Sequence, residues 1–140
     1  MPLIRCLLLC VAMPFAINGT VLADPSADEI EAAQTSVSQL TPHDVGSRYG
    51  QALGAVQICP GTSTTVKVPA LNTVYTGAAL ENFKTQARKI YDAWIKLKQC
   101  TLIDDASECK VIVDESCAAA ISEIGPSGTV LPGLMEGPPR

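Results

Sequence analysis

The side chain with the widest catalytic use in this sequence is its single histidine, His43. A Ser/His/Asp or Cys/His constellation would have to be built on it. His43 stands between Pro42 and Asp44, a setting typical of an exposed residue just inside the start of a helix. We therefore predict no catalytic residue, and an enzyme built around His43 is the weakest of the functional hypotheses.

Cysteine is the other residue type that could carry chemistry. Six are present, and two of them fall in an N-terminal segment that we expect to be removed, which leaves Cys59, Cys100, Cys109 and Cys117. No two of these four have Cys-x-x-Cys spacing, so neither a structural zinc site nor a haem attachment site is predicted. Asp104 and Asp105 are adjacent, but no calcium-loop ligand series follows them. The sequence predicts no metal and no cofactor.

Residues Met1–Ala23 have the pattern of a secretory signal peptide. Arg5 precedes an apolar run from Cys6 to Ile17, and small or apolar residues lead up to Ala23. A run of about a dozen residues is too short for a stable helix across a bilayer core of ~30 Å. Leu9 before Cys10 disfavours a lipid anchor. We expect an exported protein, periplasmic or secreted, without stable membrane insertion after signal removal.

Removal of this segment leaves a chain of ordinary domain size. The remaining 117 residues suit one domain, and the loss of Arg5 leaves nine basic against fourteen acidic residues. A net acidic balance argues against nucleic acid and anionic membranes as partners. With 47% of the full chain apolar, a disordered mature protein is also disfavoured.

An even number of cysteines in an exported chain predicts two disulfides. Cys109 and Cys117 lie eight residues apart along one predicted helix, about 12 Å, which exceeds the ~7 Å limit between bridged Cα atoms. We therefore predict Cys100 with Cys109, across a helical turn, and Cys59 with Cys117, between the N-terminal half and the hairpin. Disulfides and a short signal together favour the periplasm of a Gram-negative cell.

The central element is a helical hairpin within residues 78–124. Apolar residues recur at helical spacing along its first helix: Leu80, Phe83, Ala87, Ile90, Trp94 and Leu97. Asp105 with Glu108 predicts a cap that opens the second helix, and Gly125 with Pro126 predicts its end at Ile124. The β-branched residues 111–113 would also suit a short strand, which leaves the start of this helix less well defined.

Two further helices are predicted before the hairpin. Ser26 with Glu29 forms a capping box that opens the first, and Thr41 with Pro42 opens the second. Between the second helix and the hairpin, the threonine-rich residues 62–68 predict a short extended segment that ends at Pro69.

Glycine recurs every fourth residue along the second helix, at Gly46, Gly50 and Gly54. We interpret this row mainly as a face along which another helix of the same domain approaches closely, and the alternative is a surface for self-association or a ligand. Residues 125–140 are rich in proline and glycine and are predicted to be an extended arm. Either the arm lies over the hairpin or it offers a peptide-like segment to a partner through Val130, Leu131, Leu134 and Met135.

The predicted fold is mostly α: a small four-helix domain at residues 24–124, stapled by two disulfides, with a C-terminal helical hairpin and an extended tail. The leading functional hypothesis is a non-enzymatic binding or interaction module of the cell envelope, whose partner is a protein or a small ligand. In size, export and helix content the chain is also generically similar to small periplasmic acid-protective chaperones. This similarity implies a stress-related holdase as the alternative function and assigns no residue.

Overall fold

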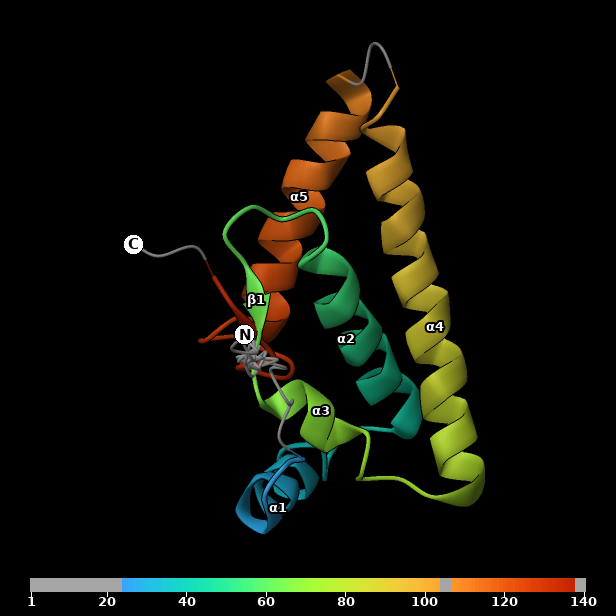
Figure 1. Cartoon of the computed structure of the whole chain (residues 1–140), viewed down its shortest axis with the longest axis vertical. Helices are drawn as coiled ribbons and strands as arrows, with labels where there is room; N and C mark the ends of the chain where they lie inside the picture. The colour runs from blue at the N-terminus through green and yellow to red at the C-terminus, as the bar shows by residue number, and fades with distance from the viewer. Residues whose placement is uncertain (1–23, 104–106, 138–140) are drawn as a thin grey trace, which may run out of the picture.

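The computed structural model describes residues 24–103 and 107–137, which form a mostly helical fold (Figure 1). In chain order the elements are α1 (Ala27–Ser36), α2 (Pro42–Ala55), β1 (Ser63–Thr64), α3 (Lys67–Leu71), α4 (Gly77–Cys100), α5 (Ser107–Ile124) and β2 (Met135–Glu136). The described residues thus hold five helices, so the predicted four-helix layout misses α3. The predicted signal peptide and the capping residue Asp105 lie outside the described residues.

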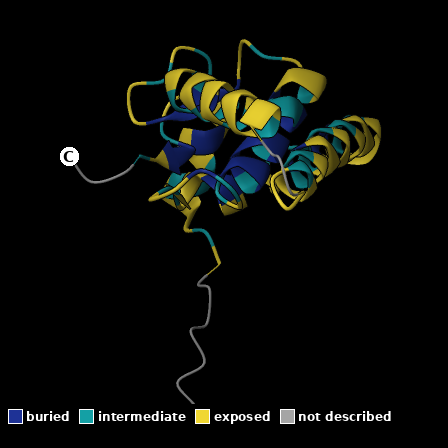
Figure 2. Cartoon of the chain, turned by 90° about the horizontal axis from the view of Figure 1, so that it is seen from above, coloured by how far each residue is buried: buried dark blue, intermediate teal, exposed yellow. Residues whose placement is uncertain are grey.

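Helix α2 lies between the two long helices α4 and α5, and α1 with α3 covers one end of the molecule (Figure 1). The most extensive helix contact is that of α2 with α4. Buried residues gather between the helices, and exposed residues line their outer faces (Figure 2). The largest fully buried side chains are Phe83, Leu71, Ile124, Leu131, Leu134, Met135 and Val45.

The first two helices begin at the predicted caps. The Ser26 hydroxyl accepts a hydrogen bond from the Glu29 N–H, and the Glu29 carboxylate accepts one from the Ser26 N–H at 2.7 Å. Thr41 caps α2 by accepting from the Asp44 N–H. These contacts satisfy main-chain donors that a helix N-terminus leaves without an intrahelical partner.

The three glycines of α2 form its contact face with α4. A methyl group at Gly46 would clash with the Phe83 carbonyl, one at Gly50 with the Ala87 carbonyl, and one at Gly54 with the Trp94 side chain. All three glycines are buried. The intramolecular packing interpretation is therefore correct, and the alternative, an interaction surface at Gly46, Gly50 and Gly54, is wrong because α4 already covers it.

The extended segment predicted for residues 62–68 is mostly wrong. Only Ser63 and Thr64 form a strand, and a short helix, α3, begins at Lys67. Pro69 is the third residue of α3, where a missing N–H removes no intrahelical hydrogen bond. A proline that looked like a stop signal is compatible with the first turn of a helix.

The C-terminal segment is folded back against α5 of the hairpin, which corrects the extended conformation predicted for it and the alternative in which it is offered to a partner. Main-chain N–H groups in residues 129–134 donate to the carbonyls of Ser122, Glu123 and Ile124 at 3.0–3.1 Å. They thus satisfy acceptors that the last turn of α5 would otherwise leave open. The residues predicted to meet a partner lie inside the fold: Val130 is half-buried, and Leu131, Leu134 and Met135 are buried.

After this turn the chain pairs with the middle of the sequence. β2 runs antiparallel to β1, with Ser63 opposite Glu136 and Thr64 opposite Met135. The Thr65 N–H donates to the Leu134 carbonyl at 3.1 Å, and the Thr65 hydroxyl donates to the Gly133 carbonyl at 2.6 Å. The C-terminal segment is thereby held to both α5 and β1.

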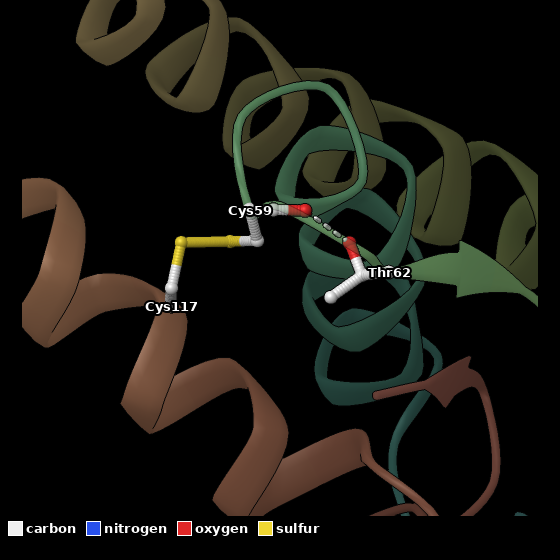
Figure 3. The surroundings of a disulfide bond; sticks show 3 residues. All are labelled: Cys59, Thr62 and Cys117. Carbon is white, nitrogen blue, oxygen red and sulfur yellow. Dashed lines mark hydrogen bonds between the residues drawn. A yellow bond between two sulfur atoms is a disulfide. The ribbon is translucent and has the colours of Figure 1, made fainter. Parts of the chain in front are cut away.

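The structure contains the two predicted disulfides. Cys59, in the loop after α2, is joined to Cys117 on α5, with the Cα atoms 5.6 Å apart (Figure 3). The Thr62 hydroxyl donates a hydrogen bond to the Cys59 carbonyl at 2.7 Å, which orders the same loop (Figure 3). Cys100 is joined to Cys109, with 5.8 Å between Cα atoms, and this bond closes the α4–α5 hairpin.

Candidate ligand-binding groove

The two surfaces expected from the sequence are internal, so the candidate site lies elsewhere. His43 is exposed at the start of α2, and its Nδ1 is 3.7 Å from Oδ1 of Asp44, beyond hydrogen-bond distance. The Thr41 hydroxyl donates to Asp44 at 2.6 Å and lowers the pKa of that carboxyl. Asp44 thus serves the cap, and no catalytic pair with His43 results.

A more promising feature is a cavity of about 470 Å³ between the N-terminus of α1, the middle of α2 and the β1–α3 segment. Its lining is mainly apolar, with Leu53, Val66, Val68 and Pro69 among the contributors. Asn72 adds a polar amide at its boundary. This volume lies within the range of ~300–1,000 Å³ typical of small-molecule sites.

A second cavity, of about 480 Å³, lies between α2 and α4. It shares Tyr49, Leu53 and Asn72 with the first cavity, and α4 contributes Phe83 and Tyr91 to the opposite wall. Because three residues line both cavities, the two adjoin each other. We call the combined feature the Tyr49 groove.

The shared wall is held in place by aromatic packing and one hydrogen bond. The Tyr49 ring meets Phe83 edge-on, with 5.1 Å between ring centroids, and the Asn72 amide donates to the Tyr49 hydroxyl at 2.8 Å. Tyr75 packs near Phe83, at 5.6 Å between centroids. Burial raises the pKa of the Tyr75 hydroxyl, which has no hydrogen-bond partner among the described residues. The wall of the groove is therefore preorganised and aromatic.

The two cavities are lined by side chains of different charge. Asp24 and Glu29 are the charged residues that line the first cavity, whereas Lys84, Arg88 and Asp92 line the second. Hydrogen bonds from the Ser26 main chain and then from its hydroxyl lower the pKa of Glu29. Glu29 is therefore ionised at neutral pH, and the groove is acidic at one end and net basic at the other.

A second exposed feature lies at the tip of the hairpin, beside the Cys100–Cys109 bond. Leu102 and Ile103 follow α4, and Val111 and Ile112 lie in the first half of α5; these four are among the most exposed large apolar residues. We call them the hairpin-tip patch. These four side chains offer hydrophobic contact at the surface.

The part of the chain that the structure describes shows no group of three or more His, Cys, Asp or Glu side chains able to hold a metal ion. Among its helices, none has both the length and the apolar character needed to cross a membrane.

Comparison with known proteins does not assign the groove. The chain matches no family model, no curated protein and no solved structure. The functional argument therefore rests on the chemistry of the chain itself.

The Tyr49 groove could not be found from sequence patterns. Its lining comes from α1, α2, β1, α3 and α4, which are far apart along the chain. One local signal was present. Tyr49 and Leu53 are four residues apart and directly precede Gly50 and Gly54. If the glycines face another helix, this pair lies at the edge of the helix–helix contact. Because α3 was not predicted, nothing in the sequence indicated that a second wall faces this edge.

Proposed function

We propose that this chain is a small exported, non-enzymatic binding protein of the periplasm, and that the Tyr49 groove holds an elongated, mainly apolar ligand. The observation that carries the proposal is the pair of adjoining cavities with a common wall of Tyr49, Leu53 and Asn72. The disulfides support it, because covalent cross-links persist in oxidising compartments.

The chemistry of the groove favours binding over catalysis. Apolar and aromatic side chains supply contact area, and a small number of polar groups fix orientation, which is the usual composition of a ligand site. The hydroxyl of Tyr49 and the amide of Asn72 already bond each other at 2.8 Å, so they act as a rigid support. His43, the single histidine on which a catalytic constellation would have to be built, is absent from the lining of both cavities.

Binding can be tested with a neutral fluorescent probe, N-phenylnaphthylamine, added to the purified protein from residue 24 onward. Two valines of similar exposure allow binding in the groove to be distinguished from binding at the hairpin tip. Val66 lines the groove and is 63% exposed, and Val111 lies in the hairpin-tip patch and is 56% exposed. Because both are exposed, replacement of either by glutamate should leave the fold intact.

We expect Val66→Glu to weaken probe binding about tenfold or more, since a factor of ten needs only ~1.4 kcal/mol and a carboxylate in an apolar site costs at least that much. Val111→Glu should leave the affinity unchanged within a factor of about two. If Val66→Glu binds the probe as tightly as the wild type, the Tyr49 groove is not the binding site. Circular dichroism of both variants confirms that the comparison is between folded proteins.

The second candidate function is a chaperone-like holdase, which the hairpin-tip patch favours because exposed apolar residues can contact unfolded clients. It predicts suppression of alcohol dehydrogenase aggregation at about pH 3, where carboxylates are protonated. The double variant Val111→Asn/Ile112→Asn, whose amides stay polar at any pH, should reduce the suppression, and Val66→Asn should not. Unchanged light scattering in the presence of the wild-type protein would reject the holdase.

A further inference from the structure

The charge distribution along the Tyr49 groove indicates which ligand it accepts. We propose that the occupant is a short peptide in extended conformation, bound with its positively charged end toward Glu29 and its carboxylate end toward Lys84 and Arg88. This inference rests on the proposed function and adds a ligand class and an orientation to it.

The acidic end is defined by α1 and the residues just before it. Asp24 and Glu29 line this end, and no basic side chain accompanies them in the lining. If cleavage follows Ala23 as predicted, the new α-amino group is on Asp24 and offsets its carboxylate. Glu29 is then the acid that matters, and the Ser26 capping contacts hold its carboxylate in place at 2.7 Å from the Ser26 N. A cationic group is the complementary ligand chemistry at this end.

The opposite end is defined by one face of α4. Lys84, Arg88 and Asp92 lie four residues apart and line the second cavity, which leaves one net positive charge there. Arg88 presents a planar fork of donors that matches a carboxylate. A ligand that spans both cavities therefore meets opposite charges at its two ends, which a peptide with free termini satisfies and a fatty acid or detergent with one charged end does not.

The wall between the two ends offers main-chain chemistry as well as apolar contact. In the β1–β2 pair, the hydrogen bond from Thr65 to Leu134 makes Thr64 and Met135 the non-hydrogen-bonded pair. The Thr64 N–H and C=O consequently point away from β2, and Thr64 lines the first cavity. An extended peptide can pair with such an edge. Leu53 and Tyr49 then contact its side chains.

The test uses a five-residue peptide of leucine, serine and tyrosine with free termini, together with its N-acetylated and C-amidated forms. Each is titrated against the protein with bound N-phenylnaphthylamine. Glu29→Gln removes the charge and keeps a capping residue, and the double variant Lys84→Gln/Arg88→Gln neutralises the basic end. Glu31→Gln on α1 and Lys96→Gln on α4 are the matched controls, because neither residue lines the groove.

We expect the free peptide to displace the probe and to bind about two- to fivefold more tightly than either capped form, the ratio typical of an exposed charge pair. Glu29→Gln should abolish only the effect of N-acetylation, and Lys84→Gln/Arg88→Gln only the effect of C-amidation. The control variants should preserve both effects.

Three outcomes would overturn the peptide assignment: both capping effects persist in the variants, the two variants exchange roles, or the peptide leaves the probe in place. In each case the probe still binds and responds to Val66→Glu, so the groove remains a ligand site. Failure of the probe itself to bind would instead reject the proposed function together with the inference that rests on it.

Discussion

Helices α4 and α5 flank the same central helix, yet they are attached to the fold in different ways. α4 lies so close to α2 that the three glycines Gly46, Gly50 and Gly54 have no room for a methyl group. α5 makes a smaller contact with α2 and carries one cysteine of each disulfide. One helix is held to α2 by close packing along its length, whereas the other combines a smaller contact with covalent bonds at separate points.

The difference shows how a chain of this size distributes its stabilising interactions. Backbone contact through glycine requires an exact register, and any added atom is resisted by the backbone of the partner helix. A disulfide acts chiefly by restricting the unfolded chain, so it tolerates a looser interface. Arg48 and Gln51 on α2 both bond the Glu123 carboxylate on α5, which adds polar contacts to the covalently held side.

The largest effect should follow from loss of the longer disulfide. Cys59 and Cys117 are 58 residues apart, and their replacement by alanine should lower the free energy of unfolding by about 4 kcal/mol in the loop-entropy account. Urea unfolding monitored by circular dichroism measures the loss. A decrease below about 1 kcal/mol would mean that α5 is held by packing after all, and the comparison with α4 would fail.

The glycine contact should be almost as sensitive. Gly50→Ala places a methyl group against the Ala87 carbonyl and should cost about 3 kcal/mol, although alanine is the better helix former by about 1 kcal/mol. Gly137→Ala is the control, because nothing lies within 4 Å of the position of its added methyl group. Thermal unfolding of the two variants distinguishes them, and a stabilised Gly50→Ala would show that α2 and α4 are less close than described.

Loss of the shorter disulfide should have a smaller effect than loss of the longer one. Cys100 and Cys109 are nine residues apart, and the same loop argument gives about 2.5 kcal/mol for their joint replacement by alanine. Hydrogen exchange should then be faster at the start of α5 and unchanged along α2. If the two disulfide variants lose the same free energy of unfolding, the contribution of each disulfide does not depend on the length of the loop that it closes.

The polar contact between α2 and α5 should contribute less again. Glu123→Gln keeps the shape of the side chain and removes its charge from Arg48, with both side chains about two-thirds buried; we expect a loss of about 1 kcal/mol. Chemical denaturation measures it, with Glu115→Gln on the exposed face of α5 as the control. If both variants unfold at the same denaturant concentration, the polar contact adds nothing to the disulfides.

The smallest effect is expected at the hairpin tip. Leu102 is 78% exposed, so Leu102→Ser should change the free energy of unfolding by less than about 0.5 kcal/mol. A larger loss would show that the tip packs against another part of the protein in solution.

Much of the helical fold was predictable because the relevant signals are local. The apolar repeat from Leu80 to Leu97 lies on α4, the Ser26 and Thr41 caps open α1 and α2, and the glycine spacing correctly indicates a close helix contact. The pairing of the cysteines followed from helix geometry. Each of these signals depends on spacing along a single helix or on the cap that opens it.

The features that were missed depend on contacts between distant segments. The order of the C-terminal segment comes from hydrogen bonds to the last turn of α5, and a sequence rich in proline and glycine does not show them. α3 was missed because Pro69 is compatible both with the first turn of a helix and with a turn that ends an extended segment. The Tyr49 groove depends on both of these regions. β1 and α3 form one of its walls, and the C-terminal segment supports that wall because β2 pairs with β1.

The position of β2 has a consequence for how this protein acquires its structure. Leu131, Leu134 and Met135 complete a core whose other members include Val45 and Leu71, so this core joins residues that are 60 or more positions apart in the chain. High contact order slows folding. Under the export that we propose, a core that needs residue 135 for its completion favours a chain that is still unfolded when it reaches a translocation channel.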